Sequence, residues 1–141
     1  MTRIEWQDDQ HSLAAGPMDE AHHEFVTLTN LLGAADDDDE ARCLQQLIAH
    51  CEAHFAQEEI WMRESRLPSA DNHTRDHEGV ISLLQSALSD VRRGQAGAGR
   101  ELVESLGEWF QRHSETMDAA LAFQMQSQAR VSPVGGIRSV G

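Results

Sequence analysis

The stretch HCEAHFAQEEIWM, residues 50–62, decides the fold. His54 and Glu58 stand four positions apart in it, about one turn of an α-helix, so their side chains point the same way. Apolar Phe55 and Met62 lie beside them in the sequence. A buried charge without a partner is costly. The stretch therefore predicts a buried helix whose imidazole and carboxylate meet other polar groups in the core.

The rest of the chain repeats this amphipathic pattern in three further stretches. Turn-forming segments at residues 33–40, 66–71 and 92–99 separate the four stretches. The core-facing stripes are Met18, His22, Phe25, Val26 and Thr29; Cys43, Leu44, Leu47, His50, Cys51, His54, Glu58, Trp61 and Met62; His73, His77, Val80, Ile81, Leu84, Leu88 and Val91; and Leu102, Leu106, Trp109, Phe110, His113, Met117 and Leu121. Four long helices with short connections predict an all-α fold, an antiparallel up-down-up-down four-helix bundle.

The predicted bundle covers residues 18–123 and is one domain. Residues 1–17 are expected to form an N-terminal arm that Pro17 closes, and residues 124–141 a flexible C-terminal extension. Asp19 is expected near the start of the first helix as a cap. The run Asp36–Asp39 is expected to begin the second helix, where its negative charge is favourable with the helix dipole.

Composition excludes several classes of partner. The 141 residues include 11 basic and 24 acidic side chains, a formal net charge of −13, which argues against binding to nucleic acid or anionic membranes. No apolar run approaches the roughly 20 residues of a membrane span, and the N-terminus lacks the apolar segment of a signal peptide. We therefore expect a cytoplasmic protein without membrane insertion. Cys43 and Cys51 are eight positions apart on one predicted helix, about 12 Å, so they are expected to be buried thiols without a disulfide.

The histidines carry the strongest functional signal. Of eight in the chain, five fall on the apolar stripes, at least one from each predicted helix: His22, His54, His73, His77 and His113. Glu58 shares the second stripe, and Asp118 lies about 140° around an ideal helix from His113, at the edge of the fourth. A single core histidine is usually structural. Five imidazoles and two carboxylates converging on one core instead predict a metal cluster.

Ligand type and number indicate the metal. Nitrogen-rich ligation with carboxylates favours a first-row transition metal over calcium or magnesium. Seven ligands exceed what one four-coordinate zinc needs. They suit two irons of higher coordination number that share the carboxylates, with His54 reaching one metal and Glu58 reaching across to the second.

These motifs resemble the hemerythrin family in its bacterial single-domain form, over residues 6 to about 122. Trp6 and the following arm, Gly16-Pro17-Met18-Asp19-Glu20-Ala21-His22 and the later Asn30 resemble its N-terminal part. The other matching elements are HF-x-x-EE-x-x-M at residues 54–62, Leu67-Pro68 followed by His73-x-x-x-His77, and Trp109-x-x-x-His113-x-x-x-x-Asp118.

The resemblance implies a role for each position. His73, His77 and His113 would hold one iron, and His22 and His54 the other, which keeps a vacant position. Glu58 and Asp118 would bridge both irons together with an oxo or hydroxo group. The ferrous pair would bind O₂ at the vacancy as a hydroperoxide. This implies a non-enzymatic O₂-binding protein for carriage, storage or delivery in a bacterial cytoplasm, with a cytoplasmic oxygenase or a signalling protein as the expected partner.

The same resemblance implies an O₂ pocket, to which we assign Trp109, Phe110 and Ser114. Ser114 stands where the family usually has a large aliphatic residue, and Phe110 where leucine is common. A hydroxyl at this wall would admit water or protons and favour loss of peroxide. Ala21 replaces the family's usual glutamine.

Two other functions stay open: a sensor of O₂, peroxide or nitric oxide, and a peroxide-consuming di-iron enzyme. The other three histidines lie outside this ligand set. His11 and His23 are expected to be exposed. His50 stands where many members have tyrosine. It either makes a structural hydrogen bond or acts beside His54 as a supporting or alternate ligand.

Overall fold

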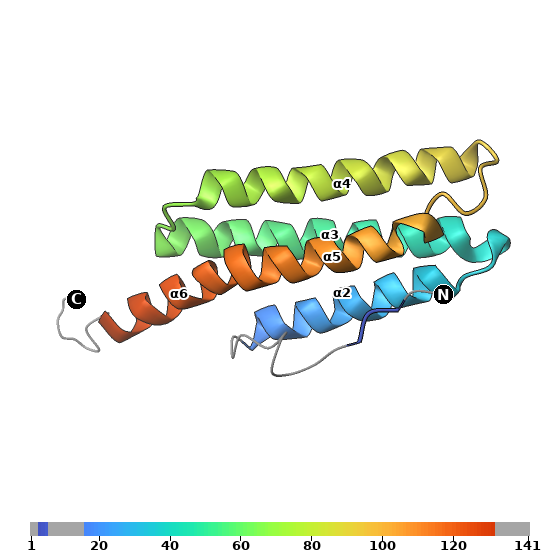
Figure 1. Ribbon diagram of the computed structural model, residues 1–141. Helices are drawn as coiled ribbons and strands as arrows, with labels where there is room; N and C mark the ends of the chain where they lie inside the picture. The colour runs from blue at the N-terminus through green and yellow to red at the C-terminus, as the bar shows by residue number, and fades with distance from the viewer. Residues whose placement is uncertain (1–2, 6–15, 132–141) are drawn as a thin grey trace.

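The computed structural model describes residues 3–5 and 16–131 (Figure 1). Its long helices are α2 (Pro17–Ala34), α3 (Asp37–Ser65) and α4 (Ala70–Arg92). A short 3₁₀ turn, η1 (Arg100–Leu102), leads into a fourth helical rod, made of α5 (Val103–His113), a π-helical turn η2 (Ser114–Asp118) and α6 (Ala119–Val131). The four rods lie side by side with successive rods reversed in direction, and the predicted four-helix bundle is confirmed.

Local sequence explains where the helices begin. Asp36 caps α3, since its Oδ1 accepts a hydrogen bond from the Asp39 N–H at 3.0 Å. The acidic run therefore lies at the positive end of the helix dipole, as expected. Helix α2 begins with Pro17 directly after Gly16, and Asp19 lies in its first turn rather than at its cap. Proline suits this first position because its missing N–H has no helical partner there.

Two features of the ends differ from expectation or fall outside it. Helix α6 continues from Gln124 to Val131, where the sequence suggested the start of a flexible extension. Within the predicted arm, residues 1–17, the structure describes residues 3–5, 16 and 17, so Trp6 and His11 lie outside the described residues. Within residues 3–5 the Ile4 backbone pairs with the Asn30 side chain, through an N–H donated to Oδ1 at 2.8 Å and a carbonyl accepting from Nδ2 at 2.8 Å.

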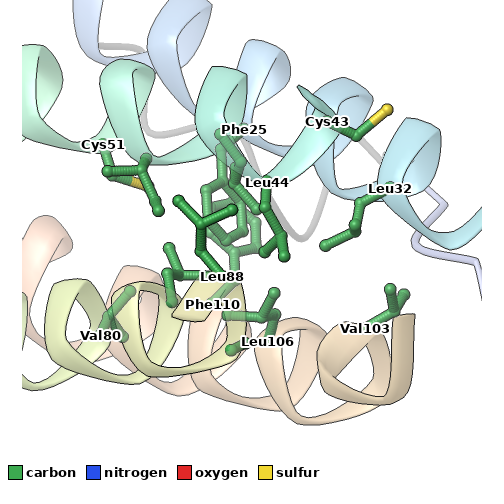
Figure 2. Close-up of a cluster of buried hydrophobic side chains, with 14 of the residues drawn as sticks. Phe25, Leu32, Cys43, Leu44, Cys51, Val80, Leu88, Val103, Leu106 and Phe110 are labelled. Atoms are coloured by element: carbon green, nitrogen blue, oxygen red, sulfur yellow. The ribbon is translucent and has the colours of Figure 1, made fainter. Parts of the chain in front are cut away.

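The apolar core forms two clusters separated by polar residues. The larger cluster, part of which is drawn in Figure 2, includes Phe25, Leu44, Leu84, Leu106 and Phe110. The smaller one consists of Met18, Met62, Leu67, Leu121 and Ala122. His22 on α2, Glu58 on α3, and His113 and Asp118 on the fourth rod stand in sequence between members of these two clusters. A site formed by these residues therefore has apolar packing on either side of it along the bundle axis.

Other expectations about the fold can be compared directly. Cys43 and Cys51 are buried free thiols, as predicted, and burial raises the pKa of Cys51 to about 12. His23 is exposed, also as predicted. Within the described ranges, no helix is both long and apolar enough to cross a membrane.

Candidate metal centre

All seven side chains singled out in the sequence meet in the middle of the bundle. Their exposed fractions run from 0% for Glu58 and His73 to 9% for His54. The donor atoms form two groups that share Glu58, and within each group they lie within 4.8 Å of one another. The groups are Glu58, His73, His77, His113 and Asp118, and His22, His54 and Glu58.

The two oxygens of Glu58 face different histidines. Oε1 lies 3.2 Å from His73 Nε2 and 3.1 Å from His77 Nε2. Oε2 lies 2.9 Å from His54 Nε2 and 3.6 Å from His22 Nε2. The carboxylate therefore stands between the two groups and can bridge them.

Asp118 repeats this arrangement from the opposite rod. Its Oδ1 lies 3.0 Å from the Nε2 atoms of both His73 and His113, and its Oδ2 lies 2.9 Å from His22 Nε2. One side of the cluster thus presents three imidazole nitrogens and two oxygens, and the other presents two nitrogens and two oxygens.

The π-helical turn brings Asp118 into this position. In an ideal α-helix it would lie about 140° from His113, at the edge of the core-facing stripe. Residues 114–118 instead form a π-turn, with the Ala119 N–H bonded to the Ser114 carbonyl five residues earlier. Such a turn inserts an extra residue into the helix. Asp118 is consequently buried, 1% exposed, next to His113.

Many polar atoms of the cluster have no hydrogen-bond partner among the described residues. They include Nδ1 and Nε2 of both His22 and His73, both oxygens of Glu58, and Asp118 Oδ1. Several lie at contact distance from each other without the directionality of a hydrogen bond. Unsatisfied buried polar groups are expensive. Lone pairs that converge in this way are what a metal ion satisfies, so the donor set fits metal cations.

Without a metal, electrostatics would hold the cluster together through protons. Burial lowers the pKa of His22 and His73, but contacts with Asp118 and Glu58 outweigh it and raise both values to about 9. Burial raises the pKa of Glu58, whereas its four histidine neighbours bring it well below the usual range. The pKa of Asp118 is lowered in the same way by His113, His22 and His73. Among the described residues, both carboxylates form ion pairs only with histidines.

A small cavity adjoins the cluster, next to both histidines of the two-histidine side and to one histidine, His113, of the other side. Its volume is about 10 Å³. The lining residues are His22, Phe25, His54, Phe55, Trp109, Phe110, His113 and Asp118. Two residues assigned to the O₂ pocket, Trp109 and Phe110, are therefore in its wall. Ser114 is not among these lining residues, although it is buried and its Oγ has no hydrogen-bond partner in the described structure.

His50 makes a structural hydrogen bond, which was one of the two roles that the sequence left open for it. Its Nε2–H donates to the Ala21 carbonyl at 3.0 Å, and its ring stacks on His54 with centroids 5.8 Å apart. Burial lowers its pKa, which Glu24 opposes. His50 also lines an open groove of about 510 Å³ between α2 and α3, which reaches His54. The contact with His54 is compatible with the second role, support of a metal ligand, which stays a prediction.

The sequence did not point to two carboxylates that the structure singles out, Asp76 beside the cluster and Glu40 at the entry to the fourth rod. Asp76 lies beside His113, with Oδ2 at 2.7 Å from Nδ1. Glu40, fully buried, accepts backbone hydrogen bonds from Gly97, Gly99 and Arg100 at 2.7–2.9 Å and so fixes the entry to the fourth rod. Asp76 directly precedes His77, which was the available signal. Glu40 was hidden inside the acidic run.

Comparison with known proteins agrees with this geometry. The family model described as the hemerythrin HHE cation binding domain matches residues 15–122. The bacteriohemerythrin of Ralstonia nicotianae is 35% identical over 118 residues, covering 84% of this chain and 85% of its own. That of Pseudomonas paraeruginosa is 31% identical over 126 residues, covering 84% and 79%.

Solved structures show the same fold. The crystal structure of wild-type hemerythrin superposes with a TM-score of 0.80 at 16% identity, covering 88% of this chain and 98% of that one. The family match, the two bacterial relatives and the buried histidine–carboxylate cluster agree. The chain belongs to the hemerythrin family.

Proposed function

We propose that this protein is a non-heme di-iron protein that binds O₂ for carriage, storage or delivery in a bacterial cytoplasm. The observation that supports this most directly is the way the carboxylate oxygens divide. Each of Glu58 and Asp118 directs one oxygen to the three-histidine side and one to the two-histidine side. Two carboxylates in this arrangement suit two metal ions held side by side.

The two sides would hold their irons differently. His73, His77 and His113, with one oxygen each from Glu58 and Asp118, offer five protein donors. His22 and His54, with the other two oxygens, offer four. The four-donor side has room for an added ligand, and both of its histidines line the 10 Å³ cavity. When bound, a ferrous pair would supply the electrons that O₂ uptake requires.

The chain's own contribution is positioning and exclusion of water. Phe25, Phe55 and Phe110 form an aromatic wall around the cavity, whose volume is close to the minimum that admits one water molecule. A cavity of this size excludes larger substrates. Removing water also strengthens the electrostatic interactions inside the site.

A second function, consumption of peroxide, is favoured by one observation. Ser114 places a buried hydroxyl directly after His113, and this hydroxyl has no hydrogen-bond partner within residues 16–129. Reduction of one peroxide to two waters takes up two protons and two electrons; a ferrous pair, when bound, would supply the electrons, and a hydroxyl near the site can relay the protons. The decay rate of the oxygenated protein distinguishes the two functions. The oxygenated form of a carrier must decay slowly, whereas that of a peroxide-consuming enzyme should decay quickly.

Metal analysis tests the proposed site. Protein produced in iron-replete medium should contain two irons per chain. His22→Ala should lose iron, whereas the matched control His23→Ala, which changes the exposed neighbouring histidine, should retain both. One metal per chain, or zinc alone at full occupancy in the wild type, would contradict the proposal.

A further inference from the structure

One carboxylate outside the seven-residue cluster touches one of its histidines. Asp76 lies on α4, and its side chain is 35% exposed. Its Oδ2 lies 2.7 Å from Nδ1 of His113 on α5. The same oxygen accepts a hydrogen bond from the indole N–H of Trp109 at 3.0 Å. Two donors from one helix thus meet a single carboxylate oxygen on its neighbour.

This contact places a proton on Nδ1 of His113. A carboxylate oxygen accepts, so Nδ1 donates, and Nε2 is the nitrogen that would offer its lone pair when a metal is bound. Nε2 faces the centre of the cluster, 3.0 Å from Asp118 Oδ1 and 3.1 Å from His77 Nε2. The Trp109 ring stacks on the imidazole with centroids 4.5 Å apart and planes 18° apart, which fixes the ring orientation.

The contact is also asymmetric within the cluster. The Nδ1 atoms of His22, His73 and His77 have no hydrogen-bond partner in the described part of the chain. His113, by contrast, is bonded to a carboxylate. A carboxylate behind an imidazole raises the basicity of the opposite nitrogen and adds negative charge near the metal that it binds. The three-histidine side therefore carries an electronic bias that the two-histidine side lacks at His22.

We infer that Asp76 is a positioning residue, which fixes the tautomer of His113 and biases the metal of the three-histidine side towards its ferric state. This inference rests on the proposed di-iron function. It assigns to Asp76 a control over the reduction potential of the site rather than a contact with iron or O₂. The residues involved in this inferred control are Asp76, Trp109 and His113.

The test compares reduction potentials of iron-loaded variants by spectroelectrochemical titration. Asp76→Asn keeps an oxygen that can accept from His113 Nδ1–H but removes the charge. It should retain two irons and shift the potential to a more positive value. Asp76→Glu restores the carboxylate and should return the potential towards that of the wild type. Glu78→Gln is the matched control, since Glu78 is exposed on the same helix and loses the same charge. Its potential should stay at the wild-type value.

Equal potentials in Asp76→Asn and Glu78→Gln, with two irons in each, would overturn the inference while leaving the proposed function intact. If the wild type fails to bind iron, the proposed function fails instead. A further measurement needs neither a variant nor bound iron. It tests the inference if the wild type does not bind iron, and also if Asp76→Asn does not fold. Nitrogen-15 NMR of ring-labelled histidine in the wild-type chain should show His113 protonated at Nδ1 and slow to exchange with solvent. An Nδ1 of His113 that lacks a proton would refute the inference with or without metal.

Discussion

Glu58 is the residue on which both halves of the cluster depend. Four histidine nitrogens from three helices lie within 3.6 Å of its two oxygens. The spacing of His54 and Glu58 on one helix face made this position predictable from sequence. The contacts of the other histidines depend on how the helices pack, so only the assembled bundle reveals them.

Replacing Glu58 with alanine should remove at least one of the two irons. The variant would lose the oxygens that face both groups and leave buried imidazoles without a compensating charge. Its thermal stability should fall as well, because metal binding energy supports the folded state. Glu59→Ala is the matched control, being the same change at a half-exposed neighbour. A Glu58→Ala protein with full iron content would show that this carboxylate is not a ligand.

Ser114 should control the lifetime of the oxygenated protein. Ser114→Ala removes the hydroxyl without adding atoms to a packed position, and Ser114→Ile replaces the hydroxyl with apolar bulk at this buried position. Both should slow decay, since the path for a proton is removed. A tenfold slowing corresponds to about 1.4 kcal/mol on the barrier. Stopped-flow decay of the oxygen band at one pH measures this. Decay that is unchanged or faster in both variants would exclude a proton-relay role for the hydroxyl.

At the scale of elements, the π-helical turn shows where sequence reasoning ends. Helical periodicity places His22, His54, His73, His77 and His113 on core-facing stripes, because each follows the ideal 100° step. Asp118 departs from that step and reaches the core only through the π-turn at residues 114–118. The helix propensities of these residues do not predict the π-turn. The motif resemblance identified Asp118, and the backbone explains how it gets there.

Asp76 and Glu40 were missed for a related reason. Asp76 lies off the apolar stripe of its helix, so the periodicity of apolar residues did not mark it, although the structure shows it half-buried. Glu40 follows a run of aspartates at the start of α3, and the helix dipole already explains why acidic residues stand there. Its actual partners are backbone N–H groups some 60 residues away. Contacts of such long sequence separation leave no periodic signal.

Glu40 should therefore matter to stability and not to metal content. It accepts three backbone N–H bonds at the entry to the fourth rod, and Glu40→Ala would leave one buried and two partly buried donors unpaired. We expect a loss of about 2–4 kcal/mol in the free energy of unfolding. Denaturant titration of the iron-loaded protein measures it. Asp38→Ala, in the same acidic run but exposed, is the control and should change little. If both variants unfold alike, the Glu40 contacts contribute nothing.

At the scale of the whole molecule, the metal-free protein should lose stability as pH rises. The folded-state pKa values of His22 and His73 are about 9, above the usual value of 6.5. Their contribution to stability is full below about pH 6.5 and is lost between there and about pH 9. Glu58 and Asp118 have lowered pKa values, so their contribution is lost only in acid. Thermal melts from pH 6 to 9.5 should show the decline.

The iron-loaded protein is the control for this pH dependence. Metal replaces the protons on the histidines, so its melting temperature should stay nearly constant over the same range. Loading should correspondingly release protons and be stronger at higher pH. A metal-free protein whose stability is flat or rises from pH 6.5 to 9 would mean that the cluster is not held by protonated histidines.

The central claim is that a two-sided cluster with one open position takes up O₂. The most direct measurement is the absorption spectrum of iron-loaded, anaerobically reduced protein before and after exposure to O₂, with iron counted in the same sample. The account predicts two irons per chain and a nearly colourless reduced form. On exposure to O₂ it should gain a charge-transfer band at once, and the band should be lost when O₂ is removed quickly. A reduced protein with two irons whose spectrum does not respond to O₂ would contradict it.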